Sequence, residues 1–193
     1  MSIILGITGG IGSGKSTVSK ILGLNNIPVY VADDESKRLT NSSVEIKEQL
    51  MQLFGRGIYE NDHLDKKLLA SHIFGDKEAL LQVNSIIHPI VKKDFCEWCI
   101  SNEVYSVVAI ESAILFESGF QDAVNKSVLV YAPLNMKIDR ILDRDGTTYE
   151  KALERIQNQM PDEEKMALSD YIIINDESES LIAQTMAIIK NLK

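Results

Sequence analysis

Short apolar runs alternate along this chain of 193 residues with longer stretches of helical periodicity. Five runs are short and mostly rich in β-branched residues, which favours buried strands over helices. They lie at residues 3–7, 27–32, 104–112, 126–132 and 170–175. The first two are joined by a glycine-rich loop and the helical pattern "KSTVSKILGL". Strand, loop, helix and strand within about 30 residues predict a βαβ unit and a parallel sheet.

Helical spacing dominates between the second and third strands. Apolar residues recur at this spacing from Glu35 to about Asn102 with no strand-like run, which predicts a helical insertion. A charged helical stretch, "NMKIDRILDRDGTTYEKALERIQNQM", separates the last two strands, and the helix "ESLIAQTMAIIKNL" closes the chain. The pattern therefore predicts an α/β fold, with a parallel sheet flanked by helices and a helical insertion.

Composition narrows the choice of partners. Hydrophobic residues make up 45% of the chain, enough for one domain with a substantial core. The net charge of −8 argues against a nucleic-acid partner, which requires a clustered basic surface. No segment approaches the ~20 apolar residues of a membrane span, and the apolar start lacks the basic region of a signal peptide. We expect a cytoplasmic protein with no membrane partner, and no obligate protein partner is evident.

Two cysteines, Cys96 and Cys99, form a C-x-x-C pair. A zinc site would need a second pair of ligands, and a redox dithiol would be expected where a helix opens after a strand. Both cysteines instead fall late in a long helical pattern, so packing is the favoured interpretation.

The glycine-rich loop carries the strongest chemical signal. Gly9, Gly14, Lys15 and Ser16 fit the phosphate-loop pattern G-x-x-x-x-G-K-S/T between a strand and a helix. Glycines let successive N–H groups turn inward around phosphate oxygens, and the helix adds its positive N-terminal end. The lysine can reach the β- and γ-phosphates, and the serine hydroxyl is the expected Mg²⁺ ligand. We therefore expect ATP to contact Gly9, Gly10, Ile11, Gly12, Ser13, Gly14, Lys15, Ser16 and Thr17.

The loop alone does not define a reaction, because GTPases, motor ATPases and small-molecule kinases share it. The sequence "NKSV" at residues 125–128 lacks the aspartate of a GTPase base-recognition motif and precedes its strand. The sequence "DRDG" at residues 143–146 matches D-x-x-G but lies in the charged helical region. Both matches are interpreted as accidental.

Acidic residues follow two of the predicted strands. Asp33 comes just after the second strand, where it could orient or deprotonate a substrate hydroxyl, although "ADDES" could also simply cap the next helix. Glu111 ends the third strand, where an acid commonly holds Mg²⁺ through water; an ordinary acid at the rim of the sheet is the alternative.

Three further residues are candidates for the site. Arg140 and Arg144 lie four residues apart on one helix face and could stabilise a transferring phosphoryl group from a mobile lid. A solvated face with ion pairs would have the same pattern. His88 precedes Pro89 within a helical pattern, where a kink could form one wall of a substrate pocket, although a packed histidine is the simpler interpretation.

Together these segments resemble the dephospho-CoA kinase family. The matching motifs are "GITGGIGSGKSTV", "VADDESKRL", "IIHPIV", "AILFE", "RILDRD" and "NQM", in the order and spacing of that family. The resemblance implies transfer of the ATP γ-phosphate to the ribose 3′-hydroxyl of dephospho-CoA, with Mg²⁺, as the last step of coenzyme A synthesis. It also implies a P-loop kinase-like fold with five parallel strands in the order 2-3-1-4-5, a helical CoA-binding part and a lid.

The family pattern can be carried over position by position. It implies a catalytic Asp33 that also contacts substrate, further substrate contacts at Thr8 beside the phosphate loop and at His88, and lid arginines at Arg140 and Arg144, of which Arg144 contacts ATP. The chain departs from the pattern at Val31, where many members have aspartate, and at Ala113, where a proline is usual. Lys37 and Arg38 could both fill the position of a basic residue that follows the aspartate.

The domain organisation follows from these assignments. We expect one kinase domain over residues 1–193, with its core at 1–34, 103–136 and 161–193. The CoA-binding insertion is expected at about 35–102 and the lid at about 137–160.

The expected mechanism gives catalytic roles to Asp33, Lys15 and Arg140. Asp33 would act on the 3′-hydroxyl, and Lys15 with Arg140 would neutralise the transferring phosphoryl group. Another small-molecule or nucleoside monophosphate kinase of the same fold is one alternative, and a non-catalytic nucleotide-binding regulatory module is another.

Overall fold

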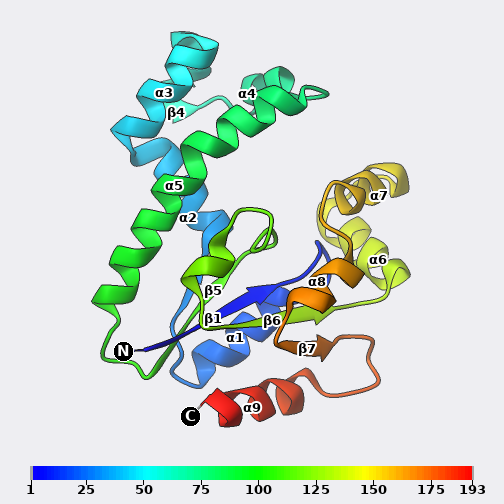
Figure 1. Ribbon diagram of the computed structural model, residues 1–193. Helices are drawn as coiled ribbons and strands as arrows, with labels where there is room; N and C mark the ends of the chain where they lie inside the picture. Colours follow the sequence, from blue (N-terminus) through cyan, green and yellow to red (C-terminus); the bar gives the residue numbers. More distant parts are fainter. Residues whose placement is uncertain (1, 193) are drawn as a thin grey trace. The chain divides into compact units, whose positions relative to one another are not determined.

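The computed structural model describes residues 2–192 (Figure 1). The chain divides into two compact units. The first unit consists of Met1–Val31 and Cys99–Lys193, of which residues 1 and 193 are not described, and the second consists of Ala32–Trp98. The strands are β1 Ile3–Thr8, β2 Val29–Val31, β3 Tyr59–Glu60, β4 His63–Leu64, β5 Val107–Glu111, β6 Lys126–Tyr131 and β7 Tyr171–Ile174. The α-helices are α1 Lys15–Leu24, α2 Ala32–Ser42, α3 Val44–Phe54, α4 Lys66–Ile73, α5 Lys77–Ser101, α6 Leu134–Asp145, α7 Tyr149–Gln157, α8 Asp162–Leu168 and α9 Leu181–Leu192. Two short 3₁₀ helices are Arg56–Ile58 and Phe120–Ala123.

The first unit is built on a five-stranded parallel sheet with the order β2-β5-β1-β6-β7 (Figure 1). Numbered among themselves along the chain, these five strands have the order 2-3-1-4-5, which confirms the expected fold class and topology. The central strand β1 pairs with β5 on one side and with β6 on the other. The carboxyl ends of β1 and β5 therefore lie side by side, as the register of Ile7 with Glu111 shows.

Alternate residues of the central strands pack on opposite faces of the sheet. Leu5 and Ile7 belong to a buried cluster with Val18 and Leu22 of α1 and with residues of α9, so these two helices cover one face. On the other face, a Cβ built at Gly6 would lie 2.7 Å from the Leu115 side chain. Because both faces are covered, the strands are apolar throughout, as the sequence pattern indicated.

The second unit is mainly helical and contains α2, α3, α4 and most of α5. Arg38 of α2 donates to both carboxylate oxygens of Asp94 of α5, at 2.8 and 2.9 Å, and so joins two of its helices. This unit overlaps most of the segment in which the insertion was expected. The proposed domain boundaries and the CoA-binding role stay predictions.

One local prediction was wrong. The insertion does contain strands, because β3 and β4 form a hairpin whose two connecting residues, Asn61 and Asp62, have φ of 48° and 66°. This is the left-handed backbone that asparagine and aspartate tolerate in two-residue turns. The charged stretch after β6 is helical, as expected, and consists of two helices that separate at Gly146, whose φ is 58°. Pro89 lies inside α5, which continues through it, and the kink expected there stays a prediction.

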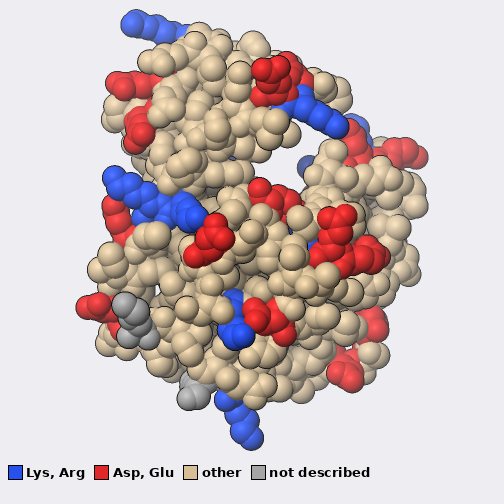
Figure 2. Space-filling view, in the orientation of Figure 1, with Lys and Arg blue, Asp and Glu red and all other residues tan. Residues whose placement is uncertain are grey.

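Charged side chains of both signs are mixed on the surface. Lys and Arg side chains are interspersed with Asp and Glu over the face shown in Figure 2. The helices within residues 2–192 include none that is both long enough and apolar enough to cross a membrane.

Candidate active site

The phosphate loop follows β1 and leads directly into α1. Gly9, Gly12 and Gly14 have φ of 147°, 81° and 100°, in a region that side chains with a Cβ rarely adopt. A Cβ at Gly12 would lie 2.6 Å from the carbonyl oxygen of Lys137, and one at Gly14 would lie 2.2 Å from the Asn175 side-chain nitrogen. The loop therefore requires glycine for its backbone angles and for the close approach of its neighbours.

The start of α1 has the properties of an anion site. Gly14 occupies the N-cap and offers no side-chain acceptor to the first-turn N–H groups, which carry the positive end of the helix dipole. Ser16 and Thr17 are exposed in this first turn. The Lys15 ammonium donates to the carbonyl oxygens of Gly9 at 2.9 Å and Gly10 at 3.2 Å, so it lies over the loop itself.

Arg140 of α6 lies against the same loop. Its guanidinium donates to the Gly12 carbonyl oxygen at 3.3 Å and to the Asn175 carbonyl oxygen at 3.3 Å. The Asn175 side-chain amide, just after β7, donates to the Ser13 carbonyl oxygen at 2.7 Å. Two segments far from the loop in the sequence, α6 and the residue after β7, therefore hold it in one conformation.

A second set of contacts holds the beginning of the loop. The Gln159 side-chain oxygen accepts a hydrogen bond from the Ile11 N–H at 2.8 Å. Lys137, only 4% exposed, pairs with Asp162 at 2.5 Å, and a Cβ at Gly10 would lie 3.4 Å from either of these side chains. The segment between α7 and α8 therefore covers the loop at Gly10 and Ile11.

Thr8 and Glu111 lie at the carboxyl ends of neighbouring strands. Thr8 is completely buried, and its hydroxyl has no hydrogen-bond partner within the described residues. Glu111 is half-buried at the end of β5, next to β1 on one side and to Val31 of β2 on the other.

The residues that could hold Mg²⁺ supply the right chemistry. The exposed Ser16 hydroxyl and the Glu111 carboxylate are oxygen donors, which Mg²⁺ prefers. Residues 2–192 include no cluster of three or more His, Cys, Asp or Glu side chains that could form a metal site by themselves. Mg²⁺ in phosphate sites usually takes one or two protein oxygens together with phosphate oxygens and water.

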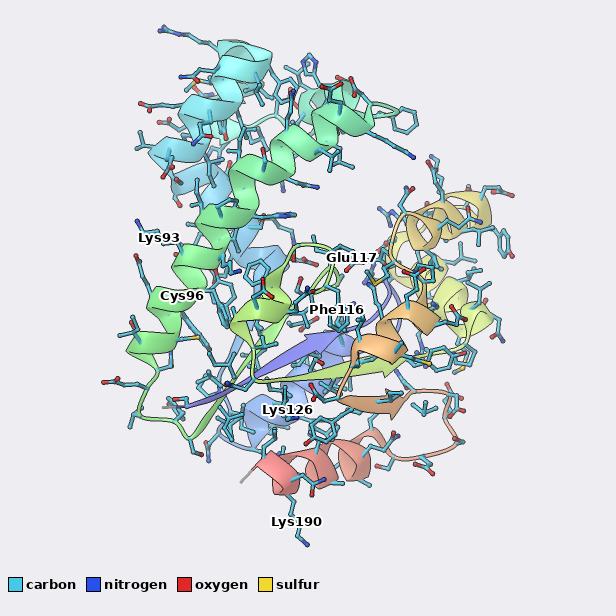
Figure 3. All side chains as sticks on the ribbon, in the orientation of Figure 1. Lys93, Cys96, Phe116, Glu117, Lys126 and Lys190 are labelled. Carbon is cyan, nitrogen blue, oxygen red and sulfur yellow. The ribbon has the colours of Figure 1, made fainter. Side chains whose placement is uncertain are left out.

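The segment after β5 is tied to α8 by a fully buried lysine. Lys165, which has no exposed surface, donates to the Ala113 carbonyl oxygen at 2.7 Å and pairs with Glu117 at 2.9 Å. Glu117, labelled in Figure 3, also accepts the Met160 N–H at 3.1 Å. These contacts of Glu117 and Lys165 join the segment after β5 to the segment between α7 and α8, which carries Gln159.

Asp33 and His88 belong to the second unit. Asp33 is the second residue of α2, two positions beyond the end of β2, and its side chain is exposed. His88 lies within α5, and its half-burial lowers the pKa of the imidazole below its ordinary value. Near Asp33, Lys37 pairs with Asp34.

Arg144 differs from Arg140 in its surroundings, although both lie on α6. Its side chain is 60% exposed and pairs with Asp145 at 2.7 Å, which raises the pKa of the guanidinium. Asp145 also pairs with Arg155 of α7, and the two arginines lower the pKa of its carboxyl group to about 2. The expected role of Arg144 in ATP binding stays a prediction.

Sequence reasoning missed three residues that contact the loop or its support: Lys137, Lys165 and Asn175. Each of the three contacts a residue far away in the sequence, and the sequence around each of them gives no indication of which residue that is. Gln159 was included only as part of the motif "NQM". The two cysteines lie late in α5 as expected, but the packing interpretation is wrong for Cys96, labelled in Figure 3, because its side chain is exposed; Cys99 is partly buried.

A phosphate loop at the end of the central strand of this sheet, with an arginine of a following helix against it, defines a P-loop kinase-type phosphotransferase. Comparisons with known proteins identify the family within this class. The family model described as dephospho-CoA kinase matches residues 3–180. The chain belongs to the dephospho-CoA kinase family.

Individual proteins agree with this assignment. A dephospho-CoA kinase of Bacteroides fragilis (strain YCH46) is 43% identical over 189 residues, which cover 98% of this chain and 92% of the relative. The crystal structure of TT1252 from Thermus thermophilus has a TM-score of 0.87 and 33% identity, covering 100% of this chain and 98% of that one. Dephospho-CoA kinase from Campylobacter jejuni, with a TM-score of 0.72 and 24% identity over 100% of this chain and 98% of its own, shares the fold.

Proposed function

We propose that this chain transfers the γ-phosphoryl group of ATP to the ribose 3′-hydroxyl of dephospho-CoA, which yields ADP and coenzyme A. The observation that carries the proposal is the contact between Arg140 and the carbonyl oxygen of Gly12 in the phosphate loop, in a chain of the dephospho-CoA kinase family. A cation held against the loop by α6 would supply positive charge for phosphoryl transfer.

The loop binds ATP through its inward-facing N–H groups and the N-terminal end of α1. Lys15, now bonded to the Gly9 and Gly10 carbonyl oxygens, turns to the β- and γ-phosphates when they replace solvent. Arg140 has further N–H groups beyond those that meet Gly12 and Asn175, and these neutralise charge on the transferring group.

Mg²⁺ would be held by the Ser16 hydroxyl and, through water, by Glu111. The ion would supply positive charge against the negative charge that develops on the phosphate oxygens. The buried Thr8 hydroxyl, which has no partner within the described residues, is a candidate to contact substrate beside the loop.

Asp33 is the proposed base or orienting group for the 3′-hydroxyl, because an exposed carboxylate shortly after β2 follows the carboxyl end of a sheet strand. The Asp33→Asn variant keeps the size of the side chain and removes its basicity. We expect kcat to fall about 10²-fold or more with ATP affinity little changed. Turnover equal to that of the wild type would exclude the base role.

An acceptor panel tests the proposed function. ADP release is measured with ATP, Mg²⁺ and, in turn, dephospho-CoA, shikimate and nucleoside monophosphates, with Lys15→Ala as the inactive control. We expect release only with dephospho-CoA. Release only with a monophosphate would assign another kinase activity, and tight ATP binding without release would assign a regulatory module.

A further inference from the structure

Gln159 lies in the short link between α7 and α8 and contacts the phosphate loop directly. Its side-chain oxygen accepts the Ile11 N–H at 2.8 Å. A backbone N–H can only donate, so this bond fixes which end of the Gln159 amide faces the loop. The other end, the Nε2 amino group, carries two donors.

The Nε2 group is held near the loop without an evident structural partner. Gln159 is partly buried, and a Cβ at Gly10 would lie 3.6 Å from its Oε1 atom. Within residues 2–192, Oε1 is engaged with Ile11, and Nε2 donates no hydrogen bond. The neighbouring cation, Lys137, is paired with Asp162. The hydrogen bond from the Ile11 N–H to Oε1 therefore holds the Nε2 donor of Gln159 beside the backbone of the phosphate loop.

We propose that Gln159 is a catalytic residue whose Nε2 group donates a hydrogen bond to an oxygen of the transferring γ-phosphoryl group. The inference rests on the proposed function. In the step, the bond from the γ-phosphorus to the β,γ-bridging oxygen breaks and the bond to the acceptor oxygen forms. The hydroxyl proton leaves to a base, and Gln159 gains and loses no atom.

The Ile11 bond makes this donor pre-organised, since one hydrogen bond sets the direction of the other. A donor fixed before the reaction lowers the barrier more than one that must reorient during it. The alternative is a clamp, in which Gln159 only holds Ile11 in place. The two roles use opposite ends of the same amide and can be separated by substitution.

The Gln159→Glu variant separates them. A carboxylate still accepts the Ile11 N–H, but it offers no donor and places negative charge beside the γ-phosphate. We expect kcat to fall about 10²-fold or more, the loss typical of removing one transition-state donor. Gln159→Ala removes both ends and serves as the comparison. Gln157→Glu, two residues away at the exposed end of α7, is the matched charge control and should keep the wild-type rate.

The pH profile gives a second readout, and the uncharged variant Gln159→Met, which also lacks a donor, separates loss of the donor from charge repulsion. Protonation of the carboxyl group introduced by Gln159→Glu restores one donor, so the rate of this variant relative to the wild type should rise as the pH falls toward the pKa of that group. A ratio independent of pH, or a Gln159→Glu rate within threefold of the wild type, would overturn the proposal. Loss of rate in Gln159→Ala alone would indicate the clamp.

A further variant covers the case in which Gln159→Glu does not fold. Gln159→Met preserves side-chain length without charge, and its kcat and ADP affinity are measured together. A kcat at least tenfold lower with ADP affinity within threefold of the wild type supports the donor role. Weakened ADP binding with unchanged kcat contradicts it. Absence of dephospho-CoA-dependent ADP release in the wild type would instead refute the proposed function.

Discussion

Replacing Lys165 by methionine should destabilise the first unit strongly. The ammonium has no exposed surface, and it donates to the Ala113 carbonyl oxygen and pairs with Glu117. Methionine has a similar length but no donor, so Lys165→Met leaves a carbonyl oxygen and a carboxylate without their cation. The side chain of Glu117 is 25% exposed and can recover some hydration, which places the loss at the lower end of the range for broken buried pairs.

The expected loss is about 3 kcal/mol. For a chain of this size, each kcal/mol lowers the melting temperature by about 2–4 °C, so we expect a decrease of about 6–12 °C. Scanning calorimetry and urea denaturation measure it. Adding Glu117→Gln to Lys165→Met removes the unpaired charge, keeps an oxygen that can accept the Met160 N–H, and should restore part of the stability.

The matched control is Lys126→Met (Lys126 is labelled in Figure 3), which breaks the surface pair of Lys126 with Asp170. The Lys126 side chain is 47% exposed, so water replaces its partner and the change should be much smaller. The reasoning is refuted if Lys165→Met lowers the melting temperature no more than Lys126→Met does. It is also refuted if the double variant is no more stable than Lys165→Met.

Two further predictions concern the loop and the second unit. Gly12→Ala places a Cβ at a position where φ is 81° and the Lys137 carbonyl oxygen would lie 2.6 Å away. We therefore expect isothermal titration calorimetry to show ADP binding weakened about tenfold or more. An unchanged ADP affinity would contradict the need for glycine. Burial lowers the pKa of His88, so the unfolded chain takes up its proton first and stability should fall as the pH drops below about 6.5. Melting temperatures of His88→Gln should vary less between pH 7 and pH 5, and an unchanged pH dependence would exclude this contribution.

The sheet could be predicted from the sequence because its signals are local. Short β-branched runs bounded by glycine, asparagine or charged residues fix the strands, and the spacing around Gly9 and Gly14 fixes the loop. The hairpin β3-β4 was missed because each strand has only two residues, although Asn61-Asp62 is a recognisable turn signal.

The supporting contacts of the site could not be read from local patterns. The segment "DEEKMAL" of α8 is rich in charge, and lysine is rarely buried completely, so nothing in the sequence indicates that Lys165 is buried. Asn175 and Gln159 bond to loop residues 162 and 148 positions away. The fold brings these partners together, and an asparagine or a glutamine also occurs in loops that contact no ligand, so the residue types alone do not identify the contacts.

Identification of the phosphorylated product tests the central claim most directly. The protein is incubated with ATP, Mg²⁺ and dephospho-CoA, and the product is analysed by mass spectrometry and by ³¹P-coupled NMR of the ribose protons. The account predicts coenzyme A with one new phosphomonoester on the 3′-oxygen, formed in equal amount with ADP. An ester at any other position, or ADP formed with free phosphate and unchanged dephospho-CoA, would contradict it.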